Sequence, residues 1–185
     1  VVSRGFDDKV GSFVVAEVLR RIGEKRKRPR CTVYGVSTVQ EELGLRGATT
    51  SAYQIQPEVG IAVEVGHASD YPEVDKKRVG EHKLGAGPIV ARGANINPIV
   101  YRLLIQTAKK MKIPVQLLGA PRATRTDANV IQLSRKGVAT GLVSVPLRYM
   151  HTPTEILSLK DLEATCQLLV GFIYELHEGM NFMPE

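Results

Sequence analysis

Apolar residues recur along the chain with two periods, one typical of helices and one typical of strands. Asp8–Gly23 has apolar residues three and four positions apart, which predicts a helix that ends before Pro29. Thr32–Val39 and Val59–Val65 are short β-branched runs that predict strands. The second run is apolar on both faces, as in a parallel sheet. A short helix is predicted between them over Gly44–Gln54.

The same alternation continues toward the C-terminus. Gly66–Asn97 is a long segment rich in Gly, Pro, His and charge, and a loop of that length is usually functional or partly disordered. The pattern then predicts strands over Val115–Leu118 and Val138–Val145, and helices over Pro98–Lys110, over Asp127–Arg135 with Thr126 as its cap, and over Leu159–His177. Strands alternating with helices predict an α/β fold, a three-layer α/β/α sandwich with a mixed, mainly parallel sheet.

Composition is that of one ordinary globular domain. The chain has 185 residues, of which 43% are hydrophobic and 24% charged. It has no apolar run long enough for a membrane span and no signal-peptide pattern, so we expect no membrane partner. Cys31 and Cys166 lie far apart without CxxC spacing, which favours reduced thiols in a cytoplasmic protein.

The net charge of +6 does not indicate a nucleic-acid partner. Much of the excess comes from one segment, Lys25–Arg30, and aromatic residues are only 5% of the chain. Nucleic-acid surfaces usually combine basic with aromatic residues. We interpret the segment as the basic end of a helix followed by a polar loop.

Acidic and histidine side chains collect where the predicted strands end. In parallel sheets this edge is where ligands bind. Taken singly, each of these residues is more often a surface charge, but together they match the ligand set of a hydrolytic two-metal site. The acidic and histidine residues after the strands are Glu41, Glu42, Glu64, His67, Asp70, Asp127 and His151. Asp7 and Asp8, before the first helix, are placed to join them, and Arg122 and Arg125 also follow the third of these strands.

Adjacent glutamates at a turn can do different work. One of Glu41 and Glu42 could bind a metal while the other moves a proton. The alternative is a pair of solvated glutamates at a helix start, where negative charge suits the helix dipole. On this stretch alone the solvated pair is the favoured interpretation.

Six short motifs in order resemble the dinuclear metallo-aminopeptidases of the TET and glutamyl-aminopeptidase family, whose members are often labelled endoglucanases. Any one motif is weak, but their common order covers the whole chain. The motifs are FDDKVG at Phe6–Gly11, TVQEELGLRGA at Thr38–Ala48, VEVGHASDYP at Val63–Pro72, KLGAGP at Lys83–Pro88, TDAN at Thr126–Asn129 and PLRYMHTPTE at Pro146–Glu155.

The resemblance implies a fold like that of zinc exopeptidases and a role for each motif residue. Asp7 would bridge two divalent metal ions, zinc or cobalt, and Glu41 would be the general base. Glu42 would be a terminal ligand and His151 a ligand of the other metal. The implied substrates are peptides cleaved at their amino ends.

Further residues follow from the same resemblance. Glu64 stands where the family usually has Asp, and its extra methylene must be absorbed if it is to ligate. The loop Gly66–Asn97 and the segment Arg122–Thr126 would wall the pocket, with Arg122, Arg125, Thr126 and Asp127 as substrate-binding residues. The family's peptide bond at the Asp7–Asp8 position is cis, and we expect it to be cis here.

The family also has a ligand histidine upstream of the DD pair, and a small dimerisation domain inserted between the two. Nothing before Asp7 supplies that histidine. We therefore expect residues 1–185 to be the C-terminal portion of a metallopeptidase catalytic domain that forms homo-oligomers when full-length.

Two other functions stay open. A glycoside hydrolase, as the endoglucanase label implies, needs two carboxylates flanking a sugar, and the adjacent Glu41 and Glu42 are poorly placed for that. A catalytically incomplete structural or binding homologue is the other possibility, because the upstream histidine is missing.

Overall fold

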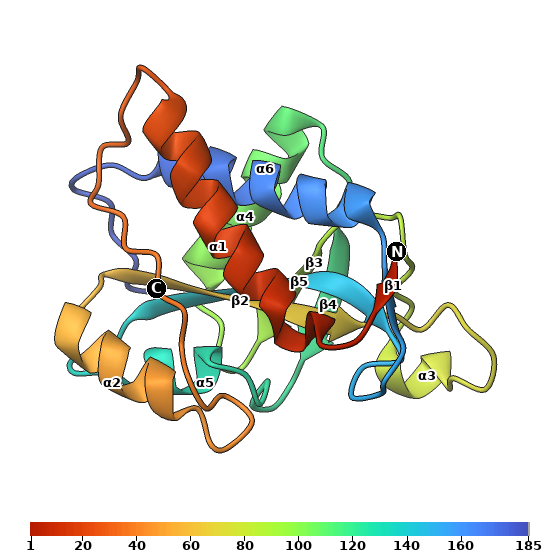
Figure 1. The fold of residues 1–185 in the computed structure, drawn as a ribbon. Helices are drawn as coiled ribbons and strands as arrows, with labels where there is room; N and C mark the ends of the chain where they lie inside the picture. The colour runs from red at the N-terminus through yellow and green to blue at the C-terminus, as the bar shows by residue number, and fades with distance from the viewer. Residues whose placement is uncertain (185) are drawn as a thin grey trace.

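The structure is a computed structural model that describes residues 1–184, apart from the side chain of Arg78. Six strands and six helices are found in this range (Figure 1). The strands are β1 (Val2–Ser3), β2 (Val59–His67), β3 (Ile89–Gly93), β4 (Gln116–Ala120), β5 (Ala139–Arg148) and β6 (Glu155–Leu157). The helices are α1 (Phe6–Glu24), α2 (Arg46–Ile55), α3 (Lys76–Val79), α4 (Pro98–Met111), α5 (Ala128–Ile131) and α6 (Leu159–Glu175).

Strand β5 is the centre of a mixed sheet. It runs parallel to β2 over the full length of that strand, from the pair Val59–Ala139 to the pair His67–Leu147. On its other side β5 pairs antiparallel with β3 and, farther along, with β6. Strand β4 is parallel to β3, and β1 is antiparallel to β6. The longest ladders are the parallel ones, as predicted.

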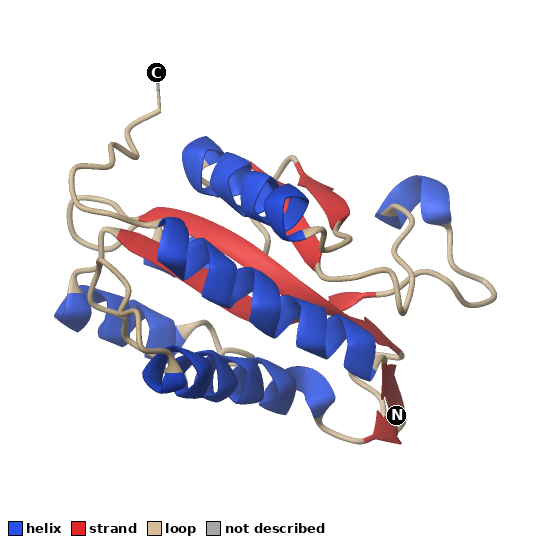
Figure 2. Ribbon diagram, turned by 90° about the horizontal axis from the view of Figure 1, so that it is seen from above, coloured by secondary structure: helices blue, strands red, loops and turns tan. Residues whose placement is uncertain are grey.

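Helices cover both faces of this sheet. Helices α1, α4 and α6 lie side by side on one face, and α2 and α5 lie on the other (Figures 1 and 2). The larger core lies under the three long helices and contains Val143, Val145 and Leu147 of β5, each fully buried. Leu142 of the same strand joins the smaller core on the α5 side. The alternation along one strand thus fills both cores and confirms the predicted three-layer α/β/α fold.

The predicted strand over Thr32–Val39 is wrong. The segment is irregular, and within residues 1–184 it pairs with no strand. Its Gly35 packs against α1, where an added Cβ would lie 2.3 Å from Leu19 Cδ1. Between the segment and β2 lies a cavity of about 410 Å³. The β-branched residues reflect the apolar character of this segment, but a strand also needs a neighbouring strand whose backbone lies within hydrogen-bonding distance.

Other boundaries also differ from the prediction. The segment Gly66–Asn97 contains β3 and α3, and the short strands β1 and β6 were not predicted. The helix predicted over Asp127–Arg135 is only the single turn α5. Thr126 does not cap it, because its hydroxyl is hydrogen-bonded to the hydroxyl of Thr124 at 2.9 Å. Elements of two to five residues carry too little periodicity to be recognised.

Both cysteines are free thiols, Cys166 buried and Cys31 half-buried, and burial raises the pKa of the Cys166 thiol to about 11. Among the described residues, no helix combines the length and apolar character needed to cross a bilayer.

Gly11 allows α1 to approach β2 closely. A Cβ at this position would lie 2.2 Å from Asp8 Oδ2 and 2.5 Å from the carbonyl oxygen of Val63. The glycine therefore sets how near the first turn of α1, with Asp7 and Asp8, comes to the end of β2.

We expect Gly11→Ala to lower the free energy of unfolding by about 1–3 kcal/mol, the usual cost of overpacking. Urea denaturation measures this change. Gly23→Ala is the matched control in the same helix, because an added Cβ there meets nothing within 4 Å. It should be neutral or stabilising by up to ~1 kcal/mol. Equal effects of the two substitutions would contradict the close approach.

Candidate metal centre

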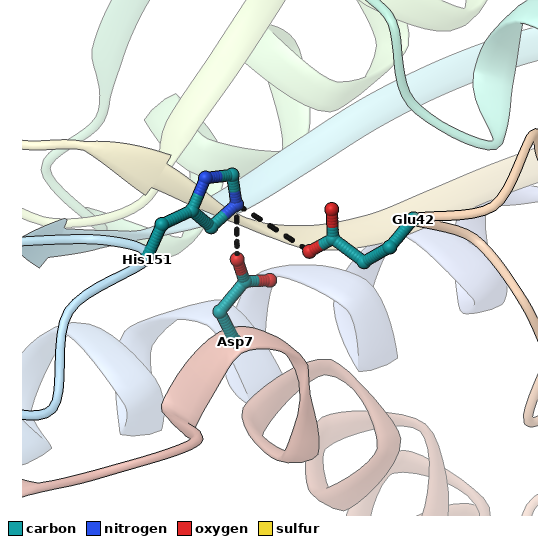
Figure 3. A group of neighbouring side chains, drawn as sticks. All are labelled: Asp7, Glu42 and His151. Carbon is teal, nitrogen blue, oxygen red and sulfur yellow. Dashed lines mark ion pairs between the residues drawn. The ribbon is translucent and has the colours of Figure 1, made fainter.

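Three side chains from separate parts of the chain converge at the carboxyl edge of the sheet (Figure 3). Asp7 comes from the first turn of α1, Glu42 from the turn before α2 and His151 from the loop between β5 and β6. His151 Nε2 lies 2.9 Å from Asp7 Oδ2 and 3.4 Å from Glu42 Oε1. Three ligand atoms, one from each residue, lie within 4.8 Å of one another, so they could hold one ion.

Glu41 and Glu42 sit in a tight turn. Gln40 and Leu45 are both left-handed, with φ of 59°. The Glu41 carbonyl oxygen accepts hydrogen bonds from the amides of Gly44 and Leu45 at 3.1 Å and 2.9 Å. The turn separates the two carboxylates: Glu42 joins Asp7 and His151, while Glu41 faces a second cluster.

The second cluster consists of Glu41, Glu64 and Asp127, whose ligand atoms also lie within 4.8 Å of one another. Glu64 and Asp127 are 8% and 6% exposed. The Asp127 amide donates to Glu64 Oε1 at 3.3 Å, and Thr38 Oγ1 donates to Asp127 Oδ2 at 2.6 Å. The remaining oxygen, Asp127 Oδ1, is buried and has no hydrogen-bond partner.

Burial and mutual repulsion raise the pKa values of these acids. Burial raises the pKa of Glu64 to about 8, with the charge of Asp8 adding to the effect. Burial likewise raises the pKa of Asp8 to about 7. The pKa values of Asp7 and Glu41 are also raised, first by burial and then by Glu42. Without a cation the site therefore resists full ionisation.

A divalent cation fits this donor set. The two clusters contain five carboxylates, and Asp8 beside them is a sixth. The clusters contain one imidazole, that of His151, and within residues 1–184 no Lys or Arg forms an ion pair with any of the six acids. The unpartnered Asp127 Oδ1 shows that the protein leaves buried negative charge uncompensated here. Oxygen and imidazole ligands of this kind suit zinc and related metals.

The loop that carries His151 is fixed at its base. Arg148, the last residue of β5, forms a two-pronged ion pair with Asp70, with both N–O distances 2.7 Å. The Asp70 carboxylate also accepts from the Leu84 amide at 3.0 Å. Tyr71 and Tyr149 pack with ring centroids 4.8 Å apart. These contacts tie the segment after β2 to the end of β5.

The structure brings most of the predicted site residues together but rearranges them. His151 was expected to serve the metal not held by Glu42, yet it lies beside Glu42. Glu64 points into the second cluster with Asp127. Arg122 and Arg125 are exposed, and neither forms an ion pair among the described residues. The Asp7–Asp8 peptide bond is cis, as expected.

Two residues that contact the site were not predicted as part of it. Thr38 holds Asp127, and Glu155 accepts from the amides of Phe6 and Asp7. Both residues lie inside the motifs that carry the family resemblance, and their place in those motifs is the sequence signal by which they could have been identified.

Comparison with known proteins gives a consistent result. The model of the M42 glutamyl aminopeptidase family matches residues 1–168. A lysyl aminopeptidase of Pyrococcus furiosus is 42% identical over 178 residues, which are 96% of this chain and 49% of that protein. The chain spans about half the length of the curated relatives it matches.

Solved structures agree. A TET aminopeptidase from a marine-sediment Thaumarchaeota archaeon is 34% identical with a TM-score of 0.89, covering 96% of this chain and 50% of that one. A TET1 peptidase from Pyrococcus horikoshii, described as assembling into a tetrahedron or a large octahedral shell, is 26% identical with a TM-score of 0.74, covering 95% of this chain and 50% of that one. The chain belongs to the M42 glutamyl aminopeptidase family.

Proposed function

We propose that this chain is the C-terminal portion of the catalytic domain of a metal-dependent aminopeptidase. The observation that supports it best is the convergence of Asp7, Glu42 and His151 beside a second acidic cluster, with no Lys or Arg paired to either among the described residues. Family membership points to the same chemistry, since several relatives are named aminopeptidases.

The proposed centre holds two divalent ions, zinc or cobalt. Asp7, Glu42 and His151 would hold one, and Asp7 would bridge to a second held by Glu64. Glu64 reaches one methylene farther than the aspartate usual in the family, and its Oε1 accepts from the Asp127 amide at 3.3 Å. In the longer protein an upstream histidine would complete the second site.

Divalent cations held by these residues would lower the pKa of a bound water and polarise the scissile carbonyl. Glu41 acts as general base: it takes a proton from the attacking water as the water oxygen bonds to the carbonyl carbon. When the carbon–nitrogen bond breaks, Glu41 delivers that proton to the leaving amine. The pKa of Glu41, raised by burial and by Glu42, brings the carboxyl nearer to the range in which it can both accept and release a proton.

The substrate is a peptide with a free amino terminus, which the cluster of carboxylates would attract. The loop 66–97 and the segment Arg122–Thr126 would form the pocket walls. Arg122 and Arg125 are exposed, so their guanidinium groups are available to contact substrate; Thr126 and Asp127 lie deeper. We propose homo-oligomerisation for the full-length protein, because the Pyrococcus horikoshii relative is described as an assembly.

Glycoside hydrolysis is less well supported. Its two carboxyl groups lie on opposite sides of the scissile bond, about 5 Å or more apart. Here the ligand atoms of Glu41, Glu64 and Asp127 lie within 4.8 Å of one another, and two of the three residues are buried. Such packing leaves no room for a sugar ring between them.

We expect Glu41→Gln to abolish proton transfer but not metal binding. In the full-length protein, hydrolysis of aminoacyl p-nitroanilides should fall by ~10²–10⁴-fold. Zinc content, measured by inductively coupled plasma mass spectrometry, should stay near that of the wild type. Glu42→Gln is the matched control, because it should lose zinc as well as activity. Equal loss of zinc in the two variants would show that the roles of the neighbours have been exchanged.

The metal-free protein should lose stability as pH rises from about 5 to about 8. Asp8 and Glu64 have pKa values near 7 and 8 in the folded state, whereas they ionise near pH ~4 in the unfolded chain. Over this window the folded state keeps protons that the unfolded state has released, so the contribution of these groups to the free energy of unfolding falls. Thermal unfolding in EDTA measures this as a fall in Tm.

Glu64→Gln should reduce that fall, because it removes the group with the higher pKa. Zinc added to the wild type at pH 8 should restore Tm, since a cation stabilises the ionised carboxylates. A Tm that falls as steeply in Glu64→Gln as in the wild type would rule out Glu64 as a source of the pH dependence.

A further inference from the structure

Glu155 is a buried carboxylate outside both clusters. It begins β6 and is 2% exposed. A buried carboxylate is unfavourable unless it is paired or hydrogen-bonded. Among the described residues Glu155 has no Lys or Arg partner in an ion pair; its Oε2 instead accepts from the amide of Phe6 at 2.6 Å and from the amide of Asp7 at 3.2 Å.

These two amides need a partner from outside their helix. The first amides of a helix have no acceptor within it, and the N-cap residue Gly5 provides no side-chain acceptor. The backbone of Asp7, with φ −82° and ψ 108°, also departs from helical geometry. Glu155, 148 residues away in sequence, therefore supplies the acceptor that local sequence does not.

Glu155 also belongs to the hairpin that carries His151. The loop between β5 and β6 contains His151, and the two strands are in register at Arg148 and Ile156. Two contacts therefore join this hairpin to Asp7. Glu155 accepts a hydrogen bond from the Asp7 backbone amide, and His151 Nε2 lies 2.9 Å from the Asp7 carboxylate. The hydrogen bond to the Asp7 amide therefore limits how far the Asp7 carboxylate can lie from the His151 ring.

Charge does not explain the placement of Glu155. A second carboxylate near Asp7 disfavours the ionised form of Asp7 and raises its pKa. What Asp7 gains is a fixed backbone. Ligand atoms must be held within a few tenths of an ångström of their bonding positions, and partners behind the ligands do this.

We propose that Glu155 is a positioning residue of the metal centre, which holds the Asp7 backbone against the His151 hairpin so that Asp7 and His151 meet at one cation. This inference rests on the proposed function, because it assumes that these two residues ligate.

Three variants separate position from charge. Glu155→Gln keeps an oxygen acceptor at the same reach, Glu155→Asp keeps the charge but withdraws the acceptor by one methylene, and Glu155→Ala removes both. Isothermal titration of the metal-free full-length protein with zinc should show binding about 10–100-fold weaker for the Asp and Ala variants. The Gln variant should stay within about threefold of the wild type. Wild-type affinity in the Asp or Ala variant, or a loss in the Gln variant as large as in the Ala variant, would overturn the proposal.

Asp161 provides a matched control. It is 1% exposed and also accepts from two backbone amides, those of Gly85 and Gly87, at 2.6 Å and 2.8 Å. Asp161→Ala should lower Tm as a comparable loss of a buried acceptor does, yet leave the zinc affinity unchanged. An equal loss of zinc affinity in Asp161→Ala would reduce the effect at Glu155 to general destabilisation and overturn the proposal.

Hydrogen exchange in EDTA tests the anchor without any metal. Exchange of the Phe6 and Asp7 amides should speed up at least about tenfold in the Asp and Ala variants and stay slow in the Gln variant. Unchanged exchange in the Asp variant would overturn the proposal even if Glu155→Ala does not fold. A wild-type chain that binds no zinc, with the expected exchange pattern, would count against the proposed function and not against the anchor.

Discussion

Mutual repulsion among buried carboxylates is the constraint on which the rest of this site depends. Asp7, Asp8, Glu41, Glu64 and Asp127 are wholly or partly withdrawn from water, and burial raises the pKa of every one of them. Such a group of acids is unfavourable in isolation. The surrounding fold must hold it together, and a divalent cation is the partner that would neutralise it.

The fold holds the acids from three directions. Parallel pairing of β2 with β5 brings Glu64 to the same edge as the hairpin with His151. Close contact at Gly11 sets α1 against β2 and brings Asp7 and Asp8 to this edge. The left-handed turn at Gln40 and Leu45 sends Glu41 and Glu42 into different clusters. The pairing of β2 with β5 and the approach of α1 to β2 thus position the acids through contacts of the backbone elements that carry them.

Much of this could be predicted from the sequence where periodicity is long. The helices α1, α4 and α6 and the strands β2 and β5 each have enough residues to show their period, and the alternation gives the layered fold. The segment Thr32–Val39 misled because its apolar β-branched residues have strand propensity, yet Tyr34 and Val39 are exposed and, within residues 1–184, the segment pairs with no strand. Residues of the site could be named from motifs, but their grouping could not. Whether His151 lies by Glu42 or by Glu64 depends on side-chain directions in turns, which short-range sequence does not specify.

The central claim is that Asp7, Glu42 and His151 share one divalent cation. X-ray diffraction from crystals grown with zinc, with anomalous differences recorded at the zinc edge, tests it most directly. The account predicts an anomalous peak about 2.0–2.2 Å from a carboxylate oxygen of Asp7, a carboxylate oxygen of Glu42 and Nε2 of His151. Crystals with zinc bound elsewhere and none between these three side chains would contradict it.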